Sequence, residues 1–242
     1  MYEIGWPGGY VTKQKRLRLQ EGALYGAGTA ALAAVSLCSL VSTVTVADPA
    51  LLRGLTAVTA AGTAAGCRFT WTRTARALRQ ARRYAIGARS ELEVRKAVRR
   101  TASIAAAYEL MLGGRGGDCD VVVFTRDCGA AAVEVKTGHG KVEVEDGAMR
   151  VGRRVLHGSP VRQAANQARK VSRRLGRKAV LAVVCVPGMT NRPFVVAGVW
   201  VCGTKDLGPV LAQAPRVFAS AAEAERTMER LGRASPGQGG TL

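Results

Sequence analysis

The chain has 242 residues, 48% of them hydrophobic, so it is long and apolar enough to bury a sizeable core. Its formal charge of +19 favours a polyanionic partner, either nucleic acid or the anionic face of a membrane, with a solvated basic surface as the alternative. The six cysteines include no Cys-x-x-Cys pair, which excludes zinc-ribbon and thioredoxin spacings and favours free thiols in a reducing compartment.

Two uncharged segments near the N-terminus predict a transmembrane helical hairpin over residues 22–71. Residues 22–47 carry no charge over 26 positions, more than the roughly 20 helical residues needed to cross a hydrocarbon core. After a turn at Asp48-Pro49, residues 54–67 are again uncharged and would return the chain. Ala, Gly, Ser and Thr are frequent in both segments, which lowers the insertion energy but suits close packing of two helices.

Basic residues flank this hairpin on both sides, in a basic N-terminus (residues 1–21) and a basic linker helix (residues 72–86). By the positive-inside rule, both termini would lie in the cytoplasm and the protein would cross the cell membrane twice. Two alternatives remain open. One is a cleaved signal peptide that ends near residue 47, and the other is a pair of soluble Ala-rich helices packed on the following domain.

Residues 72–100 have a helical pattern of apolar residues interleaved with arginine, and Gly87 predicts a break between two helices. The arginines could contact lipid head groups, DNA phosphates or only solvent. Strands are predicted at residues 109–112, 119–125, 131–136, 141–145, 179–186 and 195–201, with a short hairpin over 149–156. Helices are predicted from Pro160 to about Leu175, over 207–212 and over 221–231, with a disordered tail over 233–242. The pattern predicts one α/β domain over residues 87–232.

Three charged residues lie in two apolar strands that a six-residue turn joins. Asp120 begins the first strand, and Glu134 and Lys136, two residues apart in the second, point to the same face and can meet it. Unpaired charge is expensive to bury, so the cluster must be internally paired, as in a structural salt bridge, or neutralised by a bound cation. Carboxylates are hard oxygen ligands suited to Mg²⁺ or Mn²⁺, and the lysine can orient a water or stabilise developing charge. The cluster therefore predicts metal-dependent hydrolysis of a phosphodiester.

The spacing of Asp120 and Glu134-Val135-Lys136 resembles the PD-(D/E)xK nuclease superfamily. The surrounding residues, from about 85 to 202, resemble the nuclease-related domain, often called NERD. This resemblance implies a restriction-endonuclease-like fold, a mixed sheet flanked by helices. It also implies a divalent-metal-dependent nuclease that acts on DNA, and double-strand cutting by an enzyme with one site suggests a homodimer.

Three further stretches carry the resemblance. Gly87-Ala88-Arg89-Ser90-Glu91 resembles the helix-opening G-x-x-G-E of the domain, which implies that Glu91 faces the metal site as a third carboxylate ligand. Residues 117–123 resemble the strand that begins with the metal-binding aspartate, Asp120. Asp118 is expected in the preceding turn, with a role as a supplementary ligand as the alternative. Pro160-Val161-Arg162-Gln163-Ala164 resembles the P-x-x-Q-A helix, which implies that Gln163 lines the site.

The sequence departs from the family pattern at two positions: Ser90 stands for the second glycine of the helix motif, and Val121 stands where the family often has histidine. His139 and His157 are expected in exposed loops. Two other classes of function stay open. One is a non-catalytic module that tethers DNA to the membrane, and the other is a scaffold whose basic segments bind anionic lipid only. Because every charged position of the pattern is occupied, the enzyme is favoured.

Overall fold

The computed structural model describes residues 1–4, 9–43, 49–101, 103–111, 119–145, 148–156 and 158–233. The chain forms two compact units. One comprises Met1–Tyr10 together with Ile86–Leu242, and the other comprises Val11–Ala85. The second unit is therefore inserted in the sequence of the first.

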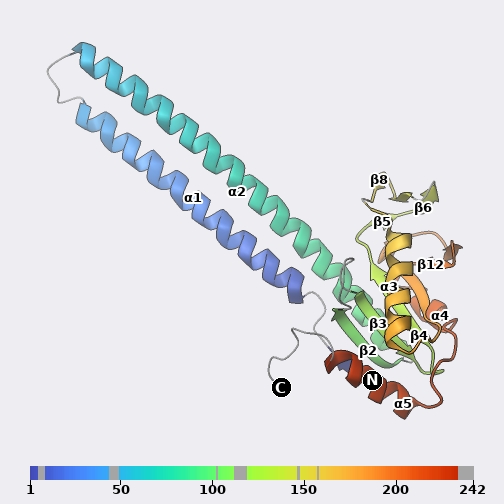
Figure 1. Cartoon of the computed structure of the whole chain (residues 1–242). Helices are drawn as coiled ribbons and strands as arrows, with labels where there is room; N and C mark the ends of the chain where they lie inside the picture. The colour runs from blue at the N-terminus through green and yellow to red at the C-terminus, as the bar shows by residue number, and fades with distance from the viewer. Residues whose placement is uncertain are drawn as a thin grey trace. The chain divides into compact units, whose positions relative to one another are not determined.

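The inserted unit is a helical hairpin. Helix α1 (Gly9–Thr43) and the first part of helix α2 (Pro49–Arg100) lie side by side and antiparallel (Figure 1). Glycine permits their close approach, because a Cβ added at Gly66 would lie 3.0 Å from a side-chain carbon of Leu32. The hydroxyl groups of Ser36 and Thr63 also form a hydrogen bond across the pair. The two helices therefore approach closely at these positions.

The transmembrane character of this hairpin is not supported. Within the described residues, no helix combines the length and the apolar character that crossing a bilayer requires. The side chains of residues 39–57 lie outside the described part of the hairpin.

Helix α2 does not break at Gly87. It continues to Arg100, so the predicted boundary between two helices was wrong. A single glycine in a helix costs only about 1 kcal/mol relative to alanine. Burial of the apolar face of the helix, with Val94 and Val98 completely buried, is enough to offset that cost.

The other unit is built on a mixed sheet of seven strands, in the order β1-β2-β3-β4-β9-β12-β11. Its strands are β1 (Tyr2–Ile4), β2 (Ser103–Leu110), β3 (Cys119–Thr125), β4 (Ala130–Val135), β9 (Leu181–Cys185), β11 (Phe194–Val196) and β12 (Val199–Cys202). Strands β4, β9 and β12 are mutually parallel, whereas β2, β3 and β4 pair antiparallel. The mixed sheet that we predicted is confirmed.

Helices cover both faces of this sheet. Helix α3 (Pro160–Arg174) and helix α5 (Ala221–Arg233) pack on one face, where Val171 and Met228 are completely buried. The last turns of α2 and the short helix α4 (Leu207–Leu211) pack on the other face, around Val98 and Leu207. Ser159 caps α3 by accepting a hydrogen bond from the backbone N–H of Arg162, which starts the helix at the predicted proline.

Two small sheets complete the unit. Strands β6 (Val142–Glu145), β7 (Ala148–Val151) and β8 (Arg154–Val155) form an antiparallel sheet, which confirms the predicted strand and hairpin. Strands β5 (His139–Gly140) and β10 (Gly188–Met189) pair parallel.

The single strand predicted over residues 195–201 was wrong. Strands β11 and β12 are two arms of an antiparallel hairpin, which turns at Ala197 and Gly198 with φ of 49° and 76°. Both values are typical of the central residues of a type I′ turn. The apolar residues on both sides of the turn concealed it in the sequence.

Candidate functional site

The register of strands β3 and β4 brings the predicted charged residues together. Val121 pairs with Val133, so one step further along the antiparallel pair Asp120 lies opposite Glu134. The backbone N–H of Val135 donates a 2.7 Å hydrogen bond to Oδ2 of Asp120. The two carboxylates project from adjacent strands toward the face of the sheet that α3 covers.

Glu134 is a buried carboxylate that accepts hydrogen bonds from two side chains. Its side chain is only 1% exposed, and its Oε1 forms an ion pair with Nζ of Lys136. Its Oε2 accepts a hydrogen bond from the Nε2 amide of Gln167, which is also 1% exposed. The carboxylate is thus held in one orientation between strand β4 and helix α3.

Lys136 connects this carboxylate to the helix. Its Nζ also donates a 3.2 Å hydrogen bond to Oε1 of Gln163 in the first turn of α3. The backbone N–H of Lys136 donates to the carbonyl of Cys185 at the end of the neighbouring strand β9. The lysine is therefore fixed at both its backbone and its ammonium group.

The negative charge at this site exceeds what Lys136 offsets. Burial raises the pKa of the Asp120 carboxyl, the charge of Glu134 raises it further, and the Val135 N–H and Lys136 only partly oppose this. Burial likewise raises the pKa of Glu134, against the lowering effect of Lys136. Protons or a cation are therefore needed to stabilise the pair.

Glu91 lies on α2, the helix that packs on the opposite face of the sheet. Its charge contributes to the raised pKa of Asp120, so it lies within electrostatic range of that carboxylate. Ser90 beside it is buried, and its hydroxyl donates a 3.2 Å hydrogen bond to Oγ1 of Thr137, next to Lys136. The serine that departs from the family pattern thus joins α2 to the segment that follows strand β4.

Gln167 is the site residue that our sequence analysis missed. It lies one helical turn after Gln163 on the same stripe of α3, so it reaches the same site. The signal available was this i, i+4 spacing, but a glutamine on a helix is far more often exposed than buried.

The remaining polar residues that we considered lie elsewhere. His139 is exposed, as predicted, but it lies in the short strand β5 and not in a loop. Asp118 and His157 lie outside the described residues. Among the described side chains, no group of three or more His, Cys, Asp or Glu residues is arranged so that it could hold a metal ion. The carboxylates brought together across the strands are the pair Asp120 and Glu134.

A mixed sheet flanked by helices, with an Asp/Glu/Lys cluster where two of its strands meet, defines this unit as an α/β domain with a buried charged site. Comparison with known families agrees, because residues 86–196 match the family described as nuclease-related domain, NERD. This match confirms the resemblance to the nuclease-related domain that the motifs predicted. Searches of the curated proteins and of the solved structures found no match.

Proposed function

We propose that this protein is a divalent-metal-dependent nuclease that hydrolyses phosphodiester bonds in DNA. The observation that carries the proposal is the pair of carboxylates, Asp120 and Glu134, that face each other across two strands of a nuclease-related domain with Lys136 bonded to one of them. The formal charge of +19 supports a polyanionic substrate.

The donor set fits a magnesium or manganese ion. Mg²⁺ is usually bound in proteins by one or two carboxylates and keeps several waters, so Asp120 and Glu134 are sufficient, with Glu91 near enough to Asp120 to add charge. Burial disfavours the charged form of both carboxyls and raises their pKa values, and a bound cation would stabilise that charged form. A bound divalent cation would polarise the phosphate and activate a water.

The chain's own residues would perform the remaining tasks. The Lys136 ammonium would stabilise negative charge that develops on the phosphate, because a fixed cation in a partly buried site acts without reorganisation. Gln163 would hold that ammonium in place. Gln167, bonded to Oε2 of Glu134, would keep the carboxylate oriented.

The direct test is cleavage of supercoiled, linear and single-stranded DNA by the full chain, with Mg²⁺, with Mn²⁺ and with EDTA. Glu134→Gln and Lys136→Met should each reduce the rate at least about 100-fold, in line with the loss of an electrostatic stabiliser or a metal ligand. Glu145→Gln and Lys141→Met are the matched controls, since both residues are exposed in or beside strand β6. Equal cleavage by the site variants and the controls would reject the proposal.

A non-catalytic module that tethers DNA is the second candidate, which the basic charge alone would support. The two are distinguished by binding and cleavage measured on the same samples. Salt-sensitive DNA binding that survives Glu134→Gln, from a folded chain without metal-dependent cleavage, would favour the tether.

We also propose that the helical hairpin attaches the protein to the cell membrane, with the nuclease-related domain in the cytoplasm. Large apolar side chains on the hairpin are well exposed, among them Leu24 at 75%, Val58 at 74% and Trp71 at 70%. Exposed apolar surface of this extent marks an interaction site, and the flanking arginines suit anionic lipid. Flotation of the full chain with anionic vesicles, resistant to high salt, is expected. A chain that stays with the soluble fraction would refute this location.

A further inference from the structure

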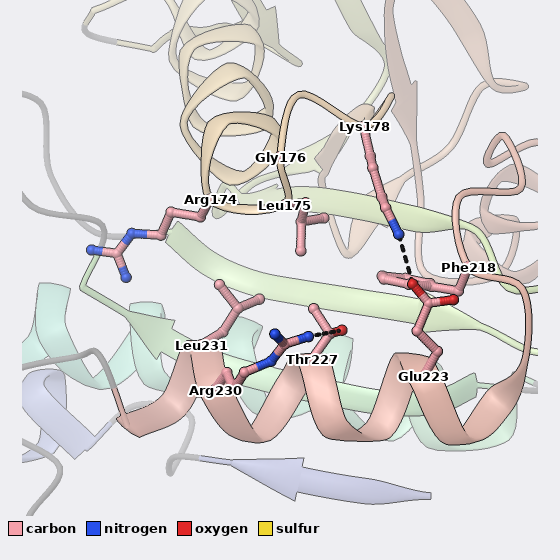
Figure 2. Close-up of a pocket in the computed structure, with 9 residues that line it drawn as sticks. All are labelled: Arg174, Leu175, Gly176, Lys178, Phe218, Glu223, Thr227, Arg230 and Leu231. Carbon is pink, nitrogen blue, oxygen red and sulfur yellow. Dashed lines mark hydrogen bonds and ion pairs between the residues drawn. The ribbon is translucent and has the colours of Figure 1, made fainter.

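A pocket of about 490 Å³ lies between the C-terminal end of helix α3 and helix α5. Figure 2 shows Leu175, from the end of α3, and Leu231, from α5, facing the space between the two helices. The charged side chains in its lining are three cations and one carboxylate: Arg174, Lys178, Arg230 and Glu223. The lining therefore combines an apolar floor with an excess of positive charge.

At one end of the pocket, the charged groups of the lining are already paired with each other or with the backbone. Nζ of Lys178 lies 2.9 Å from Oε1 of Glu223 and 4.8 Å from the centre of the buried Phe218 ring. The other carboxylate oxygen of Glu223 accepts a 2.7 Å hydrogen bond from the backbone N–H of Ala219. This carboxylate is therefore fully engaged, and the lysine already has its counter-ion.

The two arginines are in a different condition. Nη1 of Arg174 is shielded from solvent, yet it has no hydrogen-bond acceptor among the described residues. Nη2 of Arg230 donates a 3.1 Å hydrogen bond to the hydroxyl of Thr227, which leaves that arginine without a neutralising carboxylate in the lining. A shielded guanidinium nitrogen without an acceptor is energetically unfavourable, so an anion bound here would supply the missing hydrogen-bond acceptor.

We propose that this pocket binds a phosphate ester, with the phosphate on Arg174 and Arg230 and the organic part over the floor of Leu175 and Leu231. Planar guanidinium groups match phosphate oxygens through paired, charge-assisted hydrogen bonds. The volume lies in the range of pockets that hold small organic ligands, which indicates an anion of about nucleotide size.

The pocket is separate from the candidate nuclease site. Arg174 follows Gln163 by eleven residues on α3, about 16 Å along the helix axis. The ligand chemistry could come from two sources, a free mononucleotide or a phosphate of a bound nucleic acid strand. The binding experiment distinguishes them by comparing a mononucleotide with an oligonucleotide. Both are measured in EDTA, which prevents metal-dependent cleavage of the oligonucleotide.

The test is calorimetric titration of the full chain, in EDTA, with inorganic phosphate, a deoxynucleoside 5′-monophosphate and a short single-stranded oligonucleotide. Arg174→Gln and Arg230→Gln should weaken binding at least tenfold. Arg173→Gln and Arg226→Gln are matched controls, because each removes one positive charge from the same helix at an exposed position outside the pocket. These controls should change the affinity less than twofold.

The outcomes are distinct. If mononucleotide binding depends on Arg174, the ligand is a free phosphate ester. If only oligonucleotide binding depends on Arg174, the ligand is a phosphate of a nucleic acid strand. No binding of any probe, or equal weakening by pocket variants and controls, would overturn the proposal. Arg174→Lys, which keeps the charge, guards against a folding defect and should retain more affinity than Arg174→Gln.

Discussion

Two charged clusters in the same unit have opposite electrostatic balances. Glu3 in strand β1 accepts hydrogen bonds from Arg95 and Arg99 of helix α2, with oxygen–nitrogen distances of 2.6–2.9 Å. The Arg99 hydrogen bond, opposed by burial and assisted by Arg95, lowers the pKa of Glu3 to about 2. At the candidate nuclease site, burial instead raises the pKa values of Asp120 and Glu134, and the charge of Glu134 raises that of Asp120 further.

The difference separates a structural ion pair from a functional site. Two cations around one carboxylate favour its charged form, so the Glu3 cluster stabilises the fold by itself. One lysine beside two carboxylates leaves part of the negative charge uncompensated. Such charge is typical of functional sites, where it binds a ligand or takes part in catalysis. Strand β1 thus serves to hold the edge of the sheet, whereas the ends of strands β3 and β4 are arranged to receive a cation.

The largest expected effect comes from removing the only cation that contacts Glu134 among the described residues, through Lys136→Met. A buried carboxylate that loses its partner should destabilise the fold by about 3 kcal/mol at pH 8. Because the pKa of Glu134 is raised, the loss should shrink as the pH falls and the carboxyl becomes protonated. Urea unfolding at two pH values measures this. The double variant with Glu134→Gln should recover most of the stability, and no recovery would contradict the assignment.

Glu3→Gln should cost about 2 kcal/mol of unfolding free energy at pH 7, because the three charge-assisted hydrogen bonds that Arg95 and Arg99 donate to Glu3 are weakened. The folded-state pKa of Glu3 lies below its ordinary value of 4.5, at about 2. The stabilisation is therefore complete above pH 4.5 and lost as the pH falls toward 2. The unfolding free energies of the variant and the parent, measured with urea, should therefore converge as the pH falls through this range. Glu145→Gln, at an exposed position, should change the stability by less than about 0.5 kcal/mol.

Asp120→Asn should have the opposite sign. It removes one of the two repelling charges, and the asparagine carbonyl can still accept the hydrogen bond from the Val135 N–H. We expect a gain of about 1 kcal/mol in unfolding free energy at pH 8, together with loss of metal-dependent cleavage. A destabilised variant that still cleaves DNA would show that Asp120 is structural.

The sequence predicted the site better than it predicted the edges of the fold. Alternation of side chains along strands was enough to bring Glu134 and Lys136 to one face opposite Asp120, because strand periodicity is a local property. Strand β1 was not predicted, since its three residues carry no periodicity and their partner, β2, begins about 100 residues later. Gln167 was missed for a related reason: only the packing of α3 on β4 reveals that it is buried.

The smallest expected effect is the most selective one. A ligand that binds only the folded state raises the unfolding free energy by about 0.4 kcal/mol when its concentration equals its Kd. Mg²⁺ should therefore raise the urea midpoint of the parent chain, because it offsets the uncompensated carboxylates Asp120 and Glu134. Glu3→Gln should keep this increase in full, since its cluster already contains two cations. Asp120→Asn should lose it. If Mg²⁺ stabilised both variants equally, the ion would be acting on the chain in general, and the contrast between the two clusters would have no bearing on metal binding.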